Sequence, residues 1–282
     1  MKHLTLKPMT LLEALQLFYP ESSKTAIREW IRDERIALEG RVITGATRVL
    51  AKGSTIELLP KKKYIERVIP VLYEDEHFVV IDKPAGLLSV STNFQKEETA
   101  FAMLKRYYKQ KNVYVIHRLD QDTSGVMLFA FTEDATEKLK SLFEKHDLTR
   151  RYCAIVEGYP KTEEGTWRSY LWEDGRYFVH SSPNPCVGGE LAITHYKVMR
   201  KRRQFCQLEV TLETGKKNQI RVHCRNAGHP VAGDKKYGAK TDYIERLCLH
   251  ACHLAFVHPI TEKSVCFESK IPEEFFRLVR SQ

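Results

Sequence analysis

The sequence predicts an α+β protein, in which a small α/β domain precedes a larger domain built on a mixed, largely antiparallel sheet. Three observations lead to this fold class. The 282 residues exceed what one hydrophobic core comfortably needs, so one large and one small domain are expected. Segments with strand character outnumber those with helix character. Few strand–helix–strand repeats occur, which argues against a doubly wound parallel sheet.

The small domain is expected over residues 1–60. The pair Ser22-Ser23 provides a serine N-cap for a short helix. Its apolar positions are spaced for one buried face: Ala26, Ile27, Trp30 and Ile31. Its basic residues recur every four positions on another face, with one more just beyond: Lys24, Arg28, Arg32 and Arg35. Two short strands follow around a Glu39-Gly40 turn, and Lys52-Gly53 makes a second turn before a strand over 55–59.

Residues 61–70 are expected to form a basic linker, and residues 71–282 the large domain. Apolar runs predict strands at 77–82, 112–116, 126–130, 149–160 and 204–215. Helices are expected over 97–110 and after Thr132. Four apolar residues of the second helix share one face: Ala135, Leu139, Leu142 and Phe143.

The charge balance predicts an anionic partner. The net charge is +9 and the pI about 9.1, and nucleic acid is the commonest partner of such a chain. Residues 1–66 carry 12 lysines and arginines against 8 acidic residues, so the small domain is the more basic per residue. No apolar stretch approaches the roughly 18 residues of a membrane helix, and the N-terminus lacks a signal peptide's apolar core. We therefore expect a cytoplasmic protein with no membrane partner.

The cysteines indicate a reducing compartment. There are seven, an odd number, and no C-x-x-C motif occurs. One group invites a zinc interpretation: Cys248, His250, Cys252 and His253. Its spacing is not that of a usual zinc finger, so no metal site is expected.

The stretch VIHRLDQDTSG, residues 115–125, places two carboxylates and an arginine between two apolar runs. Taken alone, Asp120 is more simply a turn residue that accepts backbone N–H groups, as Asp122 is expected to be. Arg221 alone would more often be a surface strand residue, and Tyr152 alone a core residue. The alternative is that Asp120 is held at a cleft to do chemistry.

Several segments taken together resemble the RluA family of pseudouridine synthases, which convert uridine in RNA to its C-glycoside isomer. The resemblance covers residues 70–275 approximately and is carried by DKPAGL, HRLDQDTSG, RRYCAIVEG, LETGKKNQIRVHCRNAGHPVAGDKKYG and LCLHACHLAFVHPIT. The small domain resembles the S4 RNA-binding domain, through its helix, basic series, glycine hairpin and KGSTIEL strand. It departs from that pattern at Glu39, where asparagine is commoner. This layout matches the family members that act on large-subunit ribosomal RNA.

The resemblance implies a set of site residues. Asp120 would be the carboxylate that traps C1′ or stabilises its positive charge, and Arg221 the cation paired with it. The ring of Tyr152 would stack on the uracil, and its hydroxyl could take a proton. Arg118 would fill the space left by the flipped base. Ile220 and Leu249 would form apolar pocket walls. The reaction is redox-neutral and needs no group donor, so no cofactor is expected.

One segment departs from the family. The usual TGRTHQIR is here TGKKNQIR, with Lys216, Lys217 and Asn218 at the changed positions. These changes leave Asp120 and Arg221 untouched and bear on substrate positioning. His117, His223 and His250 are expected to be structural.

The predicted function is isomerisation of uridine to pseudouridine in structured RNA, with 23S ribosomal RNA as the target, by a monomer. Transfer RNA is the alternative target. A non-catalytic RNA-binding or ribosome-assembly protein would suit the basic charge equally well. A metal-dependent phosphotransferase using Asp120-Gln121-Asp122 is a third possibility, but no phosphate-cradling glycine loop accompanies that pair.

Overall fold

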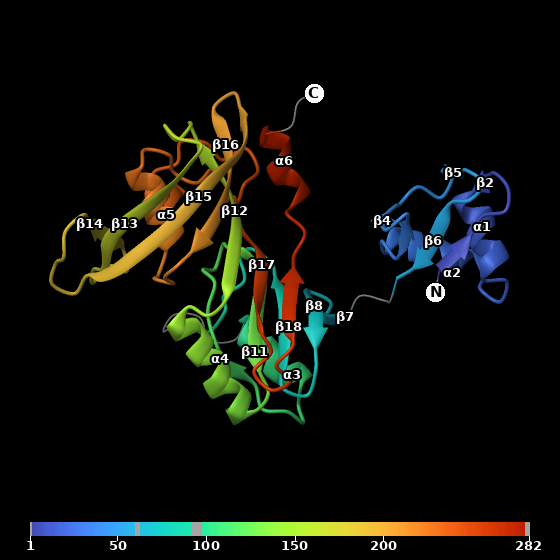
Figure 1. Ribbon diagram of the computed structural model, residues 1–282, viewed down its shortest axis with the longest axis horizontal. Helices are drawn as coiled ribbons and strands as arrows, with labels where there is room; N and C mark the ends of the chain where they lie inside the picture. Colours follow the sequence, from blue (N-terminus) through green and yellow to red (C-terminus); the bar gives the residue numbers. More distant parts are fainter. Residues whose placement is uncertain (1, 60–62, 92–97, 280–282) are drawn as a thin grey trace. The chain divides into compact units, whose positions relative to one another are not determined.

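The computed structural model describes residues 2–59, 63–91 and 98–279 (Figure 1). The chain divides into two compact units, residues 1–63 and 64–282. No helix in the described part of the chain is long and apolar enough to cross a membrane.

The N-terminal unit packs two helices, α1 (Leu11–Phe18) and α2 (Lys24–Arg32), against small sheets. The main sheet has the strand order β1 (Lys2–Leu4), β6 (Thr55–Leu58), β3 (Ile36–Leu38) and β4 (Arg41–Val42). A second pair joins β2 (Met9–Thr10) to β5 (Val49–Leu50). Apolar side chains of both helices and of the main sheet form a common core: Leu11, Leu15, Ile27, Ile31, Ile36 and Ile56.

The predicted helix and hairpin of this unit are confirmed. The side chain of Ser23 caps α2 by accepting a hydrogen bond from the Ala26 amide at 3.1 Å. Glu39 and Gly40 have φ angles of +48° and +75°, the left-handed pair that a two-residue hairpin of this hand requires. The Glu39 carboxylate also accepts a hydrogen bond from the Thr55 amide at 2.7 Å, which ties the turn to β6. Helix α1, begun by a capping box at Thr10, was not predicted.

The larger unit is built on a 12-stranded sheet, and its main path runs β14-β13-β15-β16-β12-β17-β11-β9-β8-β7. Among the described residues its neighbouring strands pair antiparallel, except that β11 and β17 run parallel. The fold class predicted from the sequence is therefore confirmed. The strands of this sheet are β7 (Lys63–Ile65), β8 (Ile69–Glu74), β9 (Phe78–Lys83), β10 (Tyr114–Val115), β11 (Ser124–Ala130), β12 (Thr149–Glu157), β13 (Glu164–Glu173), β14 (Val179–Ser182), β15 (Glu190–Arg202), β16 (Phe205–Leu212), β17 (Leu249–Val257) and β18 (Ser264–Glu268).

Helices cover the sheet at separate places. In Figure 1, α4 (Glu133–Lys145) lies beside β11, and α5 (Gln219–Asn226) lies against β13 and β15. Thr132 caps α4 as predicted, and Ala135 and Leu139 are the buried residues of its apolar face. The remaining helices are α3 (Ala100–Tyr107), α6 (Glu273–Val279) and a 3₁₀ turn, η1 (Lys235–Tyr237).

The predicted linker over 61–70 is wrong from Lys63 onward, while residues 61 and 62 lie outside the described residues. Strands β7 and β8 extend the large sheet, and Ile65 and Ile69 are fully buried in its core. The basic run KKK led to the linker prediction, but Ile65 and Ile69, which follow it, supply the buried side chains of this hairpin. The strands β13 to β15 were not predicted, although they form one end of the sheet.

A buried histidine fastens α5 to the sheet. The two ring nitrogens of His223 lie 2.9 Å from the Ser169 hydroxyl of β13 and 2.8 Å from the Thr194 hydroxyl of β15. Burial lowers the pKa of His223 from 6.5 to about 4, so the ring is neutral at pH 7. This agrees with the structural role predicted for it.

This histidine predicts a loss of stability in acid. The unfolded chain protonates the ring near pH 6.5 and the folded chain only near pH 4. The contribution of His223 to the free energy of unfolding is therefore complete above pH 6.5 and falls as the pH drops toward 4. When the pH is lowered from 7 to 5, the free energy of unfolding of His223→Gln, measured in urea, should fall by about 2 kcal/mol less than that of the wild type. His195→Gln, a change at a half-exposed histidine of β15, controls for the removal of an imidazole. Equal losses in all three proteins would contradict the buried, neutral state of His223.

Candidate active site

A cavity of about 1010 Å³ opens in the larger unit between the loop 116–123, β12, the loop 214–218 and the start of α5. Its lining contains every site residue that the sequence predicted in the large domain: Arg118, Asp120, Tyr152, Ile220, Arg221 and Leu249. These residues come from separate segments of the chain. Their meeting in one hollow makes this cavity the candidate active site.

The loop that carries Asp120 is fixed by its neighbours. The buried Lys83 ammonium and the Gly86 amide donate to the Gln121 carbonyl at 2.9 and 3.0 Å. At the end of the loop, Gly125 has a φ of +116°, and a Cβ there would lie 2.1 Å from the Ala251 carbonyl oxygen. A side chain at this position would push β11 away from β17, so the parallel contact between these strands requires glycine.

The carboxylate of Asp120 faces two donors from α5 and the residue before it. Its Oδ2 accepts a hydrogen bond from Asn218 Nδ2 at 2.6 Å and lies 3.5 Å from Arg221 Nη1. Its side chain is 25% exposed, and that of Arg221 is 9% exposed. The predicted proximity of Asp120 and Arg221 is thus present, across about a hundred residues of sequence.

The main partner of Arg221 is a residue that the sequence did not single out. Arg221 Nε and Nη2 each donate to a different oxygen of Asp234 at 2.7 Å, a bidentate ion pair in which Asp234 is 1% exposed. Burial alone would lower the pKa of Arg221, but the hydrogen bonds and charge of Asp234, with the charge of Asp120, raise it above its ordinary value. The guanidinium also lies 5.0 Å from the centre of the Tyr237 ring. Asp234 is the acidic residue of the segment GDKKYG, so the sequence did contain a candidate counter-ion for Arg221.

Arg221 lies on a helix and is buried, so the alternative of a surface strand residue is wrong. The residue at the N-cap of this helix, Asn218, has a φ of +52°, a left-handed conformation that asparagine tolerates better than most residues. Its Oδ1 accepts a hydrogen bond from the Tyr237 hydroxyl at 3.0 Å while its Nδ2 donates to Asp120. Asn218 therefore bridges the Asp120 carboxylate to the buried cluster around Arg221.

The two lysines that precede Asn218 are paired with acids of the sheet. Lys216 Nζ lies 2.6 Å from Glu190, and Lys217 pairs with Glu173. The positive charges of this segment are thus balanced within the protein.

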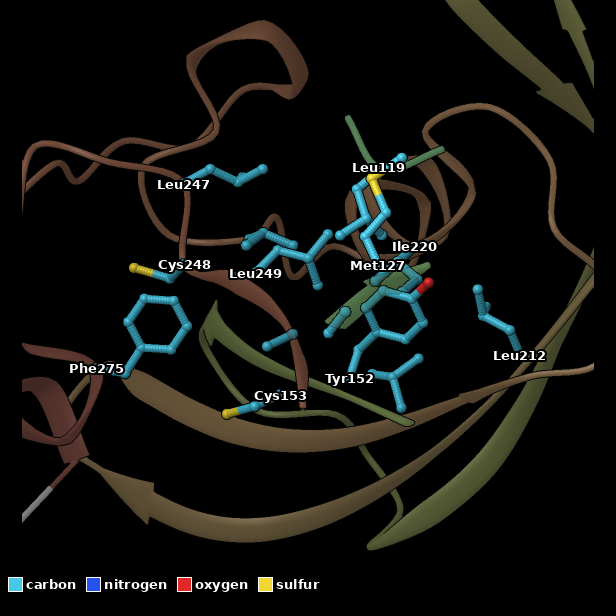
Figure 2. Close-up of a cluster of buried hydrophobic side chains, with 14 of the residues drawn as sticks. Leu119, Met127, Tyr152, Cys153, Leu212, Ile220, Leu247, Cys248, Leu249 and Phe275 are labelled. Carbon is cyan, nitrogen blue, oxygen red and sulfur yellow. The ribbon is translucent and has the colours of Figure 1, made fainter. Parts of the chain in front are cut away.

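Tyr152 lies within an apolar wall of the cavity. Figure 2 shows its ring beside Met127 and Ile220, with its hydroxyl on the side of the ring nearest Ile220 and Leu212. Burial raises the pKa of Tyr152, the charge of Arg150 opposes the rise, and the charge of Asp120 adds to it. The phenol therefore remains protonated at neutral pH and presents an apolar ring. Leu249, from β17, is buried in the same wall.

Arg118 is exposed at the edge of the cavity, next to Asp120. The other predicted RNA-binding residues belong to the N-terminal unit. Lys24, Arg28 and Arg32 are exposed on α2, although Arg32 lies 3.5 Å from Asp33. Arg35 is half-buried, and its Nε donates to the Leu59 carbonyl at 3.1 Å, so part of its hydrogen-bonding capacity serves the fold.

Potential metal ligands gather at one place in the described part of the chain: His253, Cys266 and Glu268. They do not line the cavity. Arg151 Nη2 lies 2.9 Å from His253 Nδ1, which places a positive charge against the group. Of the four residues considered for zinc in the sequence, three are absent from it.

Comparison with known proteins identifies the family. Residues 77–226, more than half of the chain, match the family described as RNA pseudouridylate synthase. The chain belongs to this family. It is 34% identical over 274 residues to "Uncharacterized RNA pseudouridine synthase YhcT" of Bacillus subtilis, a match covering 93% of this chain and 89% of the relative. It is also similar to "Ribosomal large subunit pseudouridine synthase D" of Pseudomonas aeruginosa (34% identity; 94% and 89% covered) and of Escherichia coli K12 (30%; 95% and 88%).

Solved structures agree with this membership. The chain matches "Human RNA Pseudouridylate Synthase Domain Containing 4" with a TM-score of 0.61 and 25% identity, over 75% of this chain and 91% of that one. The match to "Human RNA Pseudouridylate Synthase Domain Containing 1" has a TM-score of 0.60 and 22% identity, over 72% and 83%, and bears on the fold. The predicted RluA-family membership is confirmed, and the chain is an RNA pseudouridine synthase whose substrate is RNA.

The ion pair of Arg221 with Asp234 predicts a large difference between two aspartates of one loop. Asp234→Ala leaves the buried guanidinium short of its main counter-ion and should lower the free energy of unfolding by about 3–5 kcal/mol. Asp242→Ala removes an acid paired with Lys235, a lysine whose side chain is 79% exposed, and should cost under about 1 kcal/mol. Urea unfolding of both variants measures the difference. Similar small losses would show that Asp234 does not stabilise Arg221.

Proposed function

We propose that this enzyme converts uridine to pseudouridine in 23S ribosomal RNA, with Asp120 as the catalytic carboxylate. The observation that carries the site assignment is the Asp120 carboxylate, placed in the cavity within reach of Asn218 and Arg221. The ribosomal target is supported by two kinds of observation: relatives named for the large ribosomal subunit, and the basic N-terminal unit. Mapping pseudouridines in total RNA with and without this gene tests it. Loss of a pseudouridine from transfer RNA instead would overturn the ribosomal target.

The reaction requires two things of the protein: one anion and a pocket shaped to hold the base. The N1–C1′ bond breaks, the uracil turns and C5 bonds to C1′. C5 then releases its proton and N1 gains one, so the product is an isomer of the substrate. Both donors contact Oδ2 of Asp120, and none of the described residues donates a hydrogen bond to Oδ1. In the proposed reaction Oδ1 is the atom that meets the substrate, either by trapping C1′ or by stabilising its positive charge.

The cavity walls are proposed to hold the flipped nucleotide. Tyr152 stacks on the uracil, and Ile220 and Leu249 exclude water beside it. Because the phenol of Tyr152 is kept protonated by burial, the stacking role is favoured over proton removal by a tyrosinate. Arg118, exposed at the cavity edge, would occupy the gap that the flipped base leaves in the RNA.

The N-terminal unit is proposed to be an S4-type RNA-binding module. Its exposed helix face carries Lys24, Arg28 and Arg32, which are placed to contact phosphates, with Arg35 at its margin. The enzyme is proposed to work as a monomer in the cytoplasm. One chain supplies all the proposed catalytic residues, and all seven cysteines are free.

The role of Asp120 predicts a complete loss of turnover on a small change. Asp120→Asn keeps the size of the side chain and removes its negative charge, so the variant should fold and bind RNA but form no pseudouridine. Asp122→Asn, an equal change at an exposed residue of the same loop, should keep turnover within a few-fold of the wild type. Single-turnover assays on 23S transcripts measure both. Clear turnover by Asp120→Asn would overturn the proposal.

The proposed RNA-binding face of α2 predicts a change in salt dependence. The triple variant Lys24→Gln, Arg28→Gln, Arg32→Gln should bind RNA more weakly, and its log–log salt slope should be shallower by roughly 0.7 to 0.9 for each phosphate that it no longer neutralises. Its single-turnover rate on bound RNA should not change, because these residues lie outside the catalytic unit. Lys263→Gln, in the turn between β17 and β18, is the control for the removal of a positive charge. An unchanged slope in the triple variant would mean that the helix face is solvated only.

A further inference from the structure

Arg150 is a buried cation in the wall of the active-site cavity. It is 9% exposed, and its Nε has no hydrogen-bond partner among the described residues. Within the same part of the chain, no residue forms an ion pair or a hydrogen bond with its guanidinium. Three other cations of the cavity, Lys216, Lys217 and Arg221, each face a carboxylate. Arg118 also lines the cavity but is exposed, whereas Arg150 is buried.

The guanidinium is held in place by packing. Its Cζ lies 5.4 Å from the centre of the Phe143 ring, an arrangement that partly compensates a buried cation. On another side lies Gly215, where an added Cβ would come within 2.7 Å of Nη1. Glycine at this position therefore leaves room for the guanidinium beside the loop 214–218.

Two neighbours of Arg150, Tyr152 and His117, bring it no negative charge. Its charge opposes the burial-driven rise in the pKa of Tyr152 and adds to the burial that lowers the pKa of His117 to about 3. Both of these neighbours are neutral at pH 7. Glu144 also lines the cavity, but it forms no ion pair with Arg150 in the described structure. A buried charge without a partner is costly to keep, and an anion brought by the substrate would relieve that cost.

The position of Arg150 relative to Tyr152 suggests which anion this is. The two residues are i and i+2 on β12, so their side chains leave the same face of the sheet about 6.6 Å apart along the strand. A base stacked on Tyr152 remains joined to its ribose and backbone phosphate. That phosphate therefore lies within about the length of one nucleotide from Arg150. Guanidinium groups match the oxygens of a phosphate by paired hydrogen bonds.

We propose that Arg150 binds a backbone phosphate of the flipped uridine and so sets how deeply the nucleotide enters the cavity. This rests on the proposed placement of the base on Tyr152. Arg150 thereby supplies a phosphate site inside the catalytic unit, separate from the phosphate contacts proposed for α2.

The test compares Arg150→Gln and Arg150→Lys with Arg151→Gln. Arg151, the next residue of β12, points to the other face, where it lies 3.5 Å from Glu209 and 2.9 Å from His253. Each full-length protein is heated with and without inorganic phosphate, and its RNA affinity is measured against salt on a 23S transcript. Single-turnover rates are measured on the same RNA.

For Arg150→Gln we expect an unfolding temperature without phosphate no lower than that of the wild type, since an unpaired buried charge is removed. Its gain in unfolding temperature on adding phosphate should be smaller than that of the wild type. Its RNA affinity should fall roughly tenfold or more, with a salt slope shallower by about 0.7 to 0.9. Arg150→Lys should keep the slope, and Arg151→Gln should match the wild type in phosphate response and slope.

Two results would overturn the proposal. One is an Arg150→Gln variant with the phosphate response and salt slope of the wild type. The other is an unfolding temperature well below those of the wild type and Arg151→Gln, which would assign Arg150 to the fold. If the wild-type enzyme forms no pseudouridine in the 23S transcript, the proposed target fails, and the phosphate response then decides the role of Arg150 alone.

Discussion

The buried ion pair between Arg221 and Asp234 is the interaction on which the rest of the site depends. A guanidinium can remain in a nearly dry place only with a counter-ion, and Asp234 meets it through two bonds of 2.7 Å. This fixes Nε and Nη2 and leaves Nη1 facing Asp120 at 3.5 Å. The proposed catalytic carboxylate, Asp120, thus faces a guanidinium whose position is fixed by its two hydrogen bonds to Asp234.

The sheet brings these groups together. Asp120 lies in the loop before β11, and Gly125 lets that strand run parallel to β17 at close approach. Tyr152 comes from β12. This strand pairs with the edge of β17 opposite to the one that pairs with β11. Arg221 lies on α5, a helix that His223 fastens to β13 and β15. The functional segments therefore converge because neighbouring strands and one docked helix end at the same hollow.

Charge inside the cavity is arranged by pairing. Lys216 and Lys217 face Glu190 and Glu173, and Asn218 bridges Asp120 to Tyr237. The segment 216–218 therefore connects the site without adding free positive charge. None of the described residues forms an ion pair with the buried Arg150, and this leaves its charge available to an anion that arrives with the RNA.

The sequence by itself determined the fold class, five strands of the catalytic unit (β9, β10, β11, β12 and β16), the α2 helix with its hairpin, and the choice of Asp120, Tyr152 and Arg221 as candidate site residues. These depend on local periodicity, capping and turn chemistry, or on motifs contiguous in the chain. The tertiary structure alone decided that Arg221 lies on a helix and pairs chiefly with Asp234, that Ile65 and Ile69 continue the sheet, and that Arg150 has no partner among the described residues. Each of these depends on contacts between segments whose separation in space is set by strand order and helix docking, which no local pattern encodes.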